Sequence, residues 1–149
     1  MSSGLMRISN SFLNLIIANL EKGKTILEFG SGDGTQKLIS HGYKVYSVEQ
    51  DEKYCNLHHD NYLHAELNDG WYNNNKVVDF VRGITYDAIL IDGPASGDRR
   101  KIIDCFGETF FENALLFIDD IERKNDRKLF DILKQGREYT DFKKYGVIL

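Results

Sequence analysis

Residues 24–35 read Lys-Thr-Ile-Leu-Glu-Phe-Gly-Ser-Gly-Asp-Gly-Thr, and this stretch decides the fold. Its first half, Thr25–Phe29, is a short apolar run with a β-branched start, which is typical of a buried parallel strand. Glycines at positions 30, 32 and 34 end the strand, and an amphipathic stretch begins at Thr35. Because glycine has no Cβ, the chain can turn sharply here and a ligand can approach the backbone closely. The stretch therefore predicts a binding loop at the carboxyl end of a strand.

The spacing of the glycines separates three kinds of nucleotide loop. A phosphate-binding P-loop ends in Gly-Lys-Ser/Thr, whereas Gly34 is followed by Thr35 and Gln36, so that loop is excluded. A dinucleotide-binding loop requires G-x-G-x-x-G or a final alanine, and Thr35 stands where that small residue belongs. The pattern that remains is E-x-G-x-G-x-G, which begins at Glu28. It resembles the first motif of class I S-adenosylmethionine-dependent methyltransferases.

The resemblance implies that S-adenosylmethionine is the cofactor. This molecule has no phosphate but carries an ammonium and a sulfonium group, so a carboxylate beside the loop favours its binding. Tyr43–Val48 alternates like the next strand, and Glu49 at its end is placed to accept hydrogen bonds from ribose hydroxyls. Nicotinamide enzymes share that feature, so Glu49 alone does not select the cofactor. The residues expected to bind the cofactor are Glu28, Gly30, Ser31, Gly32, Gly34, Thr35, Glu49, Gln50, Ala65, Glu66 and Asp92.

Strand and helix patterns alternate along nearly the whole chain of 149 residues. Strands are predicted at 25–29, 43–48, 61–67, 86–91 and 114–118. Helices are predicted from Ser11 to Gly23, at 35–40, 51–56, 76–81 and 99–111, and from Asn125 or Asp126 to Gly136, and residues 139–149 suit a hairpin. The order predicts one α/β domain with a Rossmann-like, doubly wound, mainly parallel sheet, helices on both faces and an antiparallel C-terminal strand. We expect residues 1–7 to be disordered or vector-derived.

Two later strands also end in acidic residues. The strand at 86–91 leads to Asp92-Gly93-Pro94, and the strand at 114–118 leads to Asp119-Asp120. Ligands of open α/β sheets bind at this carboxyl edge, so we predict Asp92 as a general base and Asp120 as the second catalytic candidate.

These segments resemble the glycan or sugar O-methyltransferases of polysaccharide biosynthesis. The resemblance lies in Asp92-Gly93-Pro94 with Gly97 and Arg99, in Asp119-Asp120 with Arg123, and in the segment 62–72 with its Trp-Tyr pair. It implies methyl transfer to an oxygen of a small-molecule or glycan acceptor bound by Arg99, Arg123 and Trp71. Few residues separate the sheet elements, so we expect an open site, a large acceptor, or a homo-oligomer that completes the acceptor site.

Three alternatives stay open. Catechol-type O-methyltransferases hold a divalent metal at positions similar to Asp92, Asp119 and Asp120, which would suit magnesium. A nicotinamide-dependent oxidoreductase would use a Tyr-x-x-x-Lys pair or another base for hydride transfer. A non-catalytic module that binds a nucleoside cofactor would keep the same fold.

Composition excludes several other classes. The formal net charge of −4 argues against general nucleic-acid binding. No apolar run approaches the length of a membrane span, and no secretion signal is evident. Cys55 and Cys105 are isolated and are expected to be reduced core thiols. We therefore expect a cytoplasmic protein that contacts neither nucleic acid nor membrane.

Overall fold

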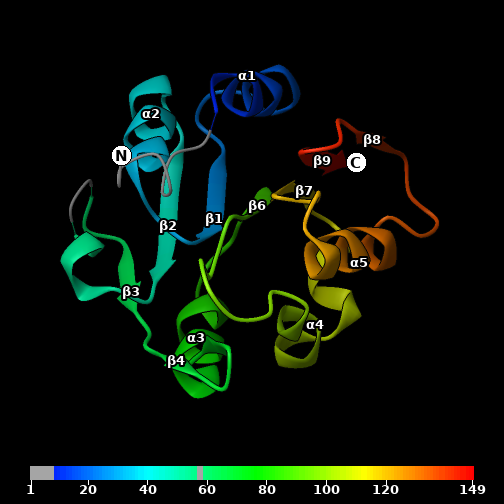
Figure 1. The fold of residues 1–149 in the computed structure, drawn as a ribbon. Coiled ribbons are helices and arrows are strands. Elements are labelled where there is room, and N and C mark those ends of the chain that lie inside the picture. The colour runs from blue at the N-terminus through cyan, green and yellow to red at the C-terminus, as the bar shows by residue number, and fades with distance from the viewer. Residues whose placement is uncertain (1–8, 57–58) are drawn as a thin grey trace.

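A central sheet of seven strands organises the molecule in the computed structural model, which describes residues 9–56 and 59–149 (Figure 1). The strand order is β3-β2-β1-β6-β7-β9-β8. The strands are β1 (Thr25–Phe29), β2 (Lys44–Glu49), β3 (Tyr62–His64), β6 (Ala88–Ile91), β7 (Leu115–Asp119), β8 (Tyr139–Asp141) and β9 (Tyr145–Ile148). The pairs from β3 to β7 are parallel, whereas β9 lies antiparallel to both β7 and β8. The mainly parallel sheet and its antiparallel C-terminal strand are therefore confirmed.

Helices cover both faces of the sheet, as predicted. Successive strand residues point to opposite faces, so Ile26 joins one apolar layer and Leu27 the other. The first layer holds α1 (Asn10–Asn19) and α2 (Asp33–His41), and the second holds α3 (Asn74–Arg82), α4 (Lys101–Phe106) and α5 (Lys124–Leu133). The central strands of the sheet are buried between these two layers, whereas β8 at one edge is exposed (Figure 1).

Four predicted elements differ in the structure. The helix predicted from Ser11 to Gly23 is α1, which begins at Asn10 and ends at Asn19. The strand predicted at 61–67 ends at His64, and the chain then forms a separate hairpin of β4 (Leu67–Asn68) and β5 (Trp71–Tyr72). The helix predicted at 51–56 is a single 3₁₀ turn, η2 (Glu52–Tyr54). The helix predicted at 99–111 is divided at Gly107, whose φ of +79° ends α4 before η3 (Glu108–Phe111).

The prediction for residues 1–7 falls outside the described residues. Within the parts of the chain that the structure describes, no helix has the length and apolar character needed to cross a membrane.

Candidate active site

The glycine loop after β1 lies directly against the loop after β6. Gly30 has a φ of +94°, and a Cβ added to it would lie 2.9 Å from the backbone carbonyl of Asp92 and 2.9 Å from the nitrogen of Gly93. The backbone nitrogen of Gly30 also donates to the carbonyl of Val48, at 2.8 Å. Residue 30 must therefore be glycine for two independent reasons, its backbone conformation and this contact.

A cavity of about 110 Å³ opens beside this contact. It is lined by Gly30, Glu49, Gln50, Asp51, Tyr54, Tyr72, Asp92, Pro94 and Ala95. The structure thus brings together four of the residues predicted for the cofactor, from the ends of three different strands. Small-molecule sites usually measure about 300–1,000 Å³, so a nucleoside cofactor would extend beyond this cavity over the open edge of the sheet.

Glu49 is fixed at the cavity wall by two backbone groups. Its side chain is only 2% exposed, and it accepts hydrogen bonds from the N–H groups of Ser31 (2.9 Å) and Asp51 (2.8 Å). Burial raises the pKa of Glu49 above its ordinary value, and these two hydrogen bonds oppose the rise. Each carboxylate oxygen has a second lone pair, so Glu49 can still accept a hydroxyl of a ligand.

Glu28 lies behind the glycine loop and does not line the cavity. The hydroxyls of Thr35 and Ser47 each donate to its Oε1 atom at 2.6 Å. Burial raises the pKa of Glu28 to about 7, although these hydrogen bonds lower it. The other loop residues predicted to bind the cofactor, Ser31, Gly32, Gly34 and Thr35, are likewise buried beside this carboxylate rather than exposed at the cavity.

Two more residues predicted to bind the cofactor lie away from the cavity. Ala65 is fully buried, and its N–H donates to the carbonyl of Glu49 at 2.9 Å. Glu66 is exposed and forms an ion pair with Lys76 at 3.1 Å. Both positions follow from the early end of β3, after which the chain turns into the β4–β5 hairpin.

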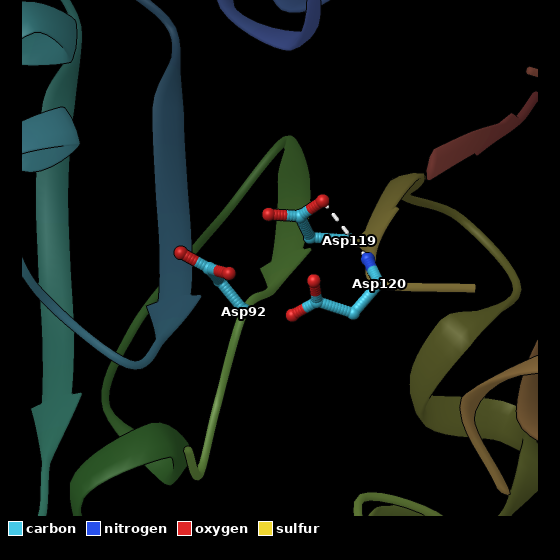
Figure 2. Close-up of side chains that lie close together, drawn as sticks. All are labelled: Asp92, Asp119 and Asp120. Atoms are coloured by element: carbon cyan, nitrogen blue, oxygen red, sulfur yellow. Dashed lines mark hydrogen bonds between the residues drawn. The ribbon is translucent and has the colours of Figure 1, made fainter. Parts of the chain in front are cut away.

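Three aspartates converge at the ends of β6 and β7 (Figure 2). Oxygens of Asp92, Asp119 and Asp120 lie within 4.8 Å of one another, and the N–H of Asp120 donates to Asp119 at 2.9 Å. Burial and then the neighbouring Asp119 carboxylate hold the pKa of Asp92 well above its usual range. Burial and Asp120 also raise the pKa of Asp119. The cluster can hold a proton, and its oxygen ligands are of the kind that magnesium prefers.

Arg99 holds the two strand ends of the aspartate cluster together. Its side chain is 4% exposed and forms ion pairs with Asp120 (3.2 Å) and Asp126 (3.8 Å). Its guanidinium also donates to three backbone carbonyls, those of Asp92 (3.1 Å), Pro94 (3.2 Å) and Asp119 (3.3 Å). With its donors engaged in this way, Arg99 is placed to position the strand ends, although the sequence predicted it as an acceptor ligand.

Arg123 is more accessible than Arg99. Its side chain is 54% exposed and lies 3.6 Å from Asp120. It borders a second cavity, of about 260 Å³, whose wall shares Pro94 and Ala95 with the cavity beside Gly30. A ligand in the second cavity would therefore be next to one in the first.

The two residues of the Trp-Tyr pair of β5 border partly different cavities. Trp71, predicted to bind the acceptor, is 4% exposed, packs on Phe29 and borders a different cavity beside Cys105. Tyr72 lines the cavity beside Gly30, and its hydroxyl would lie 2.5 Å from a Cβ on Gly93. Tyr54 and Tyr72 line this cavity but were not among the site residues predicted from the sequence. The only signal for Tyr72 was its place in the pair, because neighbouring strand residues face opposite sides.

The Tyr-x-x-x-Lys spacing of some nicotinamide enzymes occurs twice in the chain, at Tyr72–Lys76 and Tyr139–Lys143. Lys76 is exposed and pairs with Glu66. Tyr139 lies on β8, the last strand of the sheet, beyond β9 and β7 from the cavity. Tyr72 alone of these four residues lines the cavity beside Gly30, so neither pair is complete there.

Comparison with known proteins places this architecture among the Rossmann-like methyltransferase folds. A TehB-like S-adenosylmethionine-dependent methyltransferase from Corynebacterium glutamicum superposes with a TM-score of 0.55, over 98% of this chain and 89% of that chain, at 13% sequence identity. At this identity the similarity establishes the fold. No protein-family model and no curated protein sequence matches the chain.

Proposed function

We propose that the protein is an S-adenosylmethionine-dependent methyltransferase that methylates an oxygen of a sugar or another small hydroxylated acceptor. The observation that carries the proposal is the meeting of Gly30, Glu49 and Asp92 around one cavity at the carboxyl edge of the sheet. This edge is where open α/β sheets bind their ligands, and the fold is that of a methyltransferase.

The residues around the cavity fit the cofactor. Glu49 offers a fixed carboxylate for ribose hydroxyls, and Gly30 leaves room for the cofactor along the backbone. The Oε1 atom of Gln50 is buried at the cavity and has no hydrogen-bond partner among the described residues. An unsatisfied buried acceptor costs about 1–3 kcal/mol, so a ligand donor at this point would be favoured.

The cofactor supplies a methyl group that is already activated by the positive sulfur. Held beside Gly30 and Glu49, it would supply that methyl group to the acceptor oxygen, and the carbon–sulfur electron pair would stay on sulfur. Positioning the acceptor for this displacement contributes up to roughly 7–11 kcal/mol. Arg123, at the neighbouring cavity, is an accessible cation that would orient an anionic or polyhydroxylated acceptor.

Asp92 is our candidate for the base that takes the hydroxyl proton. It lines the cavity and its raised pKa makes the carboxylate a stronger base than an exposed aspartate. A positioned base contributes about 10²–10⁴-fold to the rate. Asp120 is the second candidate, but ion pairs with Arg99 and Arg123 already engage its carboxylate.

A metal-assisted form of the same reaction is the second candidate, favoured by the close approach of Asp92, Asp119 and Asp120. These three carboxylates would hold a divalent ion, which would acidify a bound hydroxyl. Methyl transfer by protein treated with EDTA and resupplied with magnesium separates the two forms. A rate that EDTA leaves unchanged would exclude the metal.

The test of the cofactor is calorimetric titration with S-adenosylmethionine and, separately, with NADH. We expect micromolar binding of the first and none of the second. Glu49→Gln, which keeps the side-chain volume, should weaken binding at least several-fold, and Glu112→Gln, on the exposed surface away from the cavity, should not. Absence of S-adenosylmethionine binding would refute the proposal and favour a non-catalytic module. Binding of NADH would favour an oxidoreductase.

A further inference from the structure

Glu28 is the common end point of two hydrogen-bonded chains. In the first chain, the hydroxyl of Ser47 donates to Glu28 at 2.6 Å and lies 2.8 Å from Nε2 of His59. The N–H of Asn61 donates to Nδ1 of the same ring, at 2.9 Å. Since Nδ1 accepts a hydrogen bond, a neutral His59 carries its hydrogen on Nε2 and donates it to Ser47. The hydroxyl hydrogen of Ser47 is then directed at Glu28.

The second chain runs through the glycine loop itself. The hydroxyl of Tyr62 lies 2.6 Å from that of Ser31, which lies 3.0 Å from that of Thr35. Thr35 donates to Glu28 at 2.6 Å and also accepts the N–H of Gly32, at 3.2 Å. One assignment of hydrogens satisfies every member of both chains, with each hydroxyl donating toward Glu28. An ionised carboxylate fits this assignment, because it only accepts hydrogen bonds.

We propose that Glu28 anchors the glycine loop from behind, in a chain that continues through Ser47 to His59, and that ionisation of Glu28 tightens cofactor binding. Glu28 is thus a positioning residue that acts through Thr35 and the loop, and it does not touch the cofactor. This inference rests on the proposed function, because the loop it anchors is the proposed cofactor loop.

Protonation of Glu28 weakens the anchor. Ser47 and Thr35 both donate to Oε1, so a proton on Oε2 leaves these two hydrogen bonds in place but removes the negative charge toward which they are directed. Hydrogen bonds to an ionised acceptor are stronger than those between neutral groups, so the loop loosens when Glu28 takes up a proton.

Burial sets the ionisation of Glu28 near neutrality, since its pKa is raised to about 7. The other titratable groups that face it are Glu49 at the end of β2, Tyr62 of β3, Tyr72 of β5 and, through the bridging serine, His59. Glu49 raises the pKa of Glu28 further by charge repulsion. Glu49 lines the cavity and has a raised pKa itself, so the test must distinguish the two carboxylates.

The first experiment measures the dissociation constant of S-adenosylmethionine between about pH 6 and about pH 8. For the unaltered protein we expect binding to tighten as the pH rises, by up to about tenfold per pH unit below the pKa of Glu28. Glu28→Gln keeps an acceptor oxygen but cannot ionise, so its affinity should be flat over this range. Asp79→Asn, on the exposed face of α3, should keep the slope. A slope that persists in Glu28→Gln would assign it to Glu49 or Asp92 and overturn the proposal, as would a flat profile for the unaltered protein.

The second experiment follows the free energy of unfolding without cofactor between about pH 4 and about pH 8. Because folding raises the pKa of Glu28, its contribution to stability is complete below about pH 4.5 and is lost as the pH rises through about 7. Glu28→Gln should lack this loss. Ser47→Ala removes a hydrogen bond that lowers the pKa of Glu28, so the loss of stability should occur at higher pH. If the pH midpoint of this loss were unchanged, the hydrogen-bonded chain through Ser47 would be refuted. Failure of cofactor binding at every pH would overturn the proposed function and the coupling together, and the unfolding series would still decide whether Glu28 and Ser47 are linked.

Discussion

Replacing Gly30 by alanine tests whether the two loops at the carboxyl edge of the sheet must touch. A left-handed backbone costs a non-glycine residue about 1–2 kcal/mol, and Gly30 has a φ of +94°. The new Cβ would also lie 2.9 Å from backbone atoms of Asp92 and Gly93, which cannot rotate away as a flexible side chain would. Forcing an extra carbon into a packed region costs about 1–3 kcal/mol. We therefore expect a total loss of about 2–5 kcal/mol in the free energy of unfolding, measured by urea denaturation.

Gly23→Ala is the matched control for this measurement. Gly23 has a similar φ, +85°, but a Cβ there would have nothing within 4 Å. Its substitution should therefore cost only the backbone strain, about 1–2 kcal/mol. The difference between the losses of unfolding free energy of the two variants measures the contribution of the contact between the loops. Equal losses of unfolding free energy for Gly30→Ala and Gly23→Ala would refute the argument that this contact shapes the site. The affinity for S-adenosylmethionine provides a second comparison, because we expect it to fall only for Gly30→Ala.

Three further predictions concern the aspartate cluster and the cavity. Asp92→Asn should lower the rate of methyl transfer by about 10²–10⁴-fold with a small effect on cofactor affinity, and a rate within a few-fold of the unaltered enzyme would remove Asp92 as the base. Arg99→Met removes the buried partner of Asp120 and should lower the free energy of unfolding by about 3–5 kcal/mol. Arg123→Met removes only an exposed ion pair and should lower it by less than about 1 kcal/mol. Tyr72→Phe should leave the protein folded and weaken S-adenosylmethionine binding by about 0.5–1.5 kcal/mol in a calorimetric titration, because it removes a hydroxyl that borders the cavity. Unchanged affinity would show that this hydroxyl does not contact the cofactor.

Local signals were sufficient to predict the glycine loop and the parallel strands. Thr25–Phe29 is an apolar run bounded by glycine. Both signals, the apolar run and the glycine, can be recognised within a few consecutive residues. The strand predicted at 61–67 was too long because alternation alone does not show where a neighbouring strand ends. Beyond Ala65, whose N–H still reaches the carbonyl of Glu49, the backbone pairs instead within its own hairpin.

The roles of individual side chains depended on contacts between distant segments. Arg99 meets the ends of two strands that are far apart in the sequence, and nothing near it in the chain distinguishes an arginine facing solvent from one surrounded by carbonyls. Similarly, Glu28 was predicted to help bind the cofactor because of its place before the glycines. Its actual surroundings come from Ser47 on the adjacent strand and from Thr35 at the start of the following helix.

The charges around the cavity discriminate between the two kinds of cofactor. Glu49, Asp51 and Asp92 line it, and its described lining residues include no lysine or arginine. Burial raises the pKa values of Glu49 and Asp92, and the Arg99 guanidinium compensates the charge of Asp92 only in part. A ligand bearing ammonium and sulfonium groups would supply that compensation, whereas the pyrophosphate of a nicotinamide cofactor would add negative charge to the same low-dielectric region. The electrostatics of the site therefore favour a cationic cofactor independently of the spacing of the glycines.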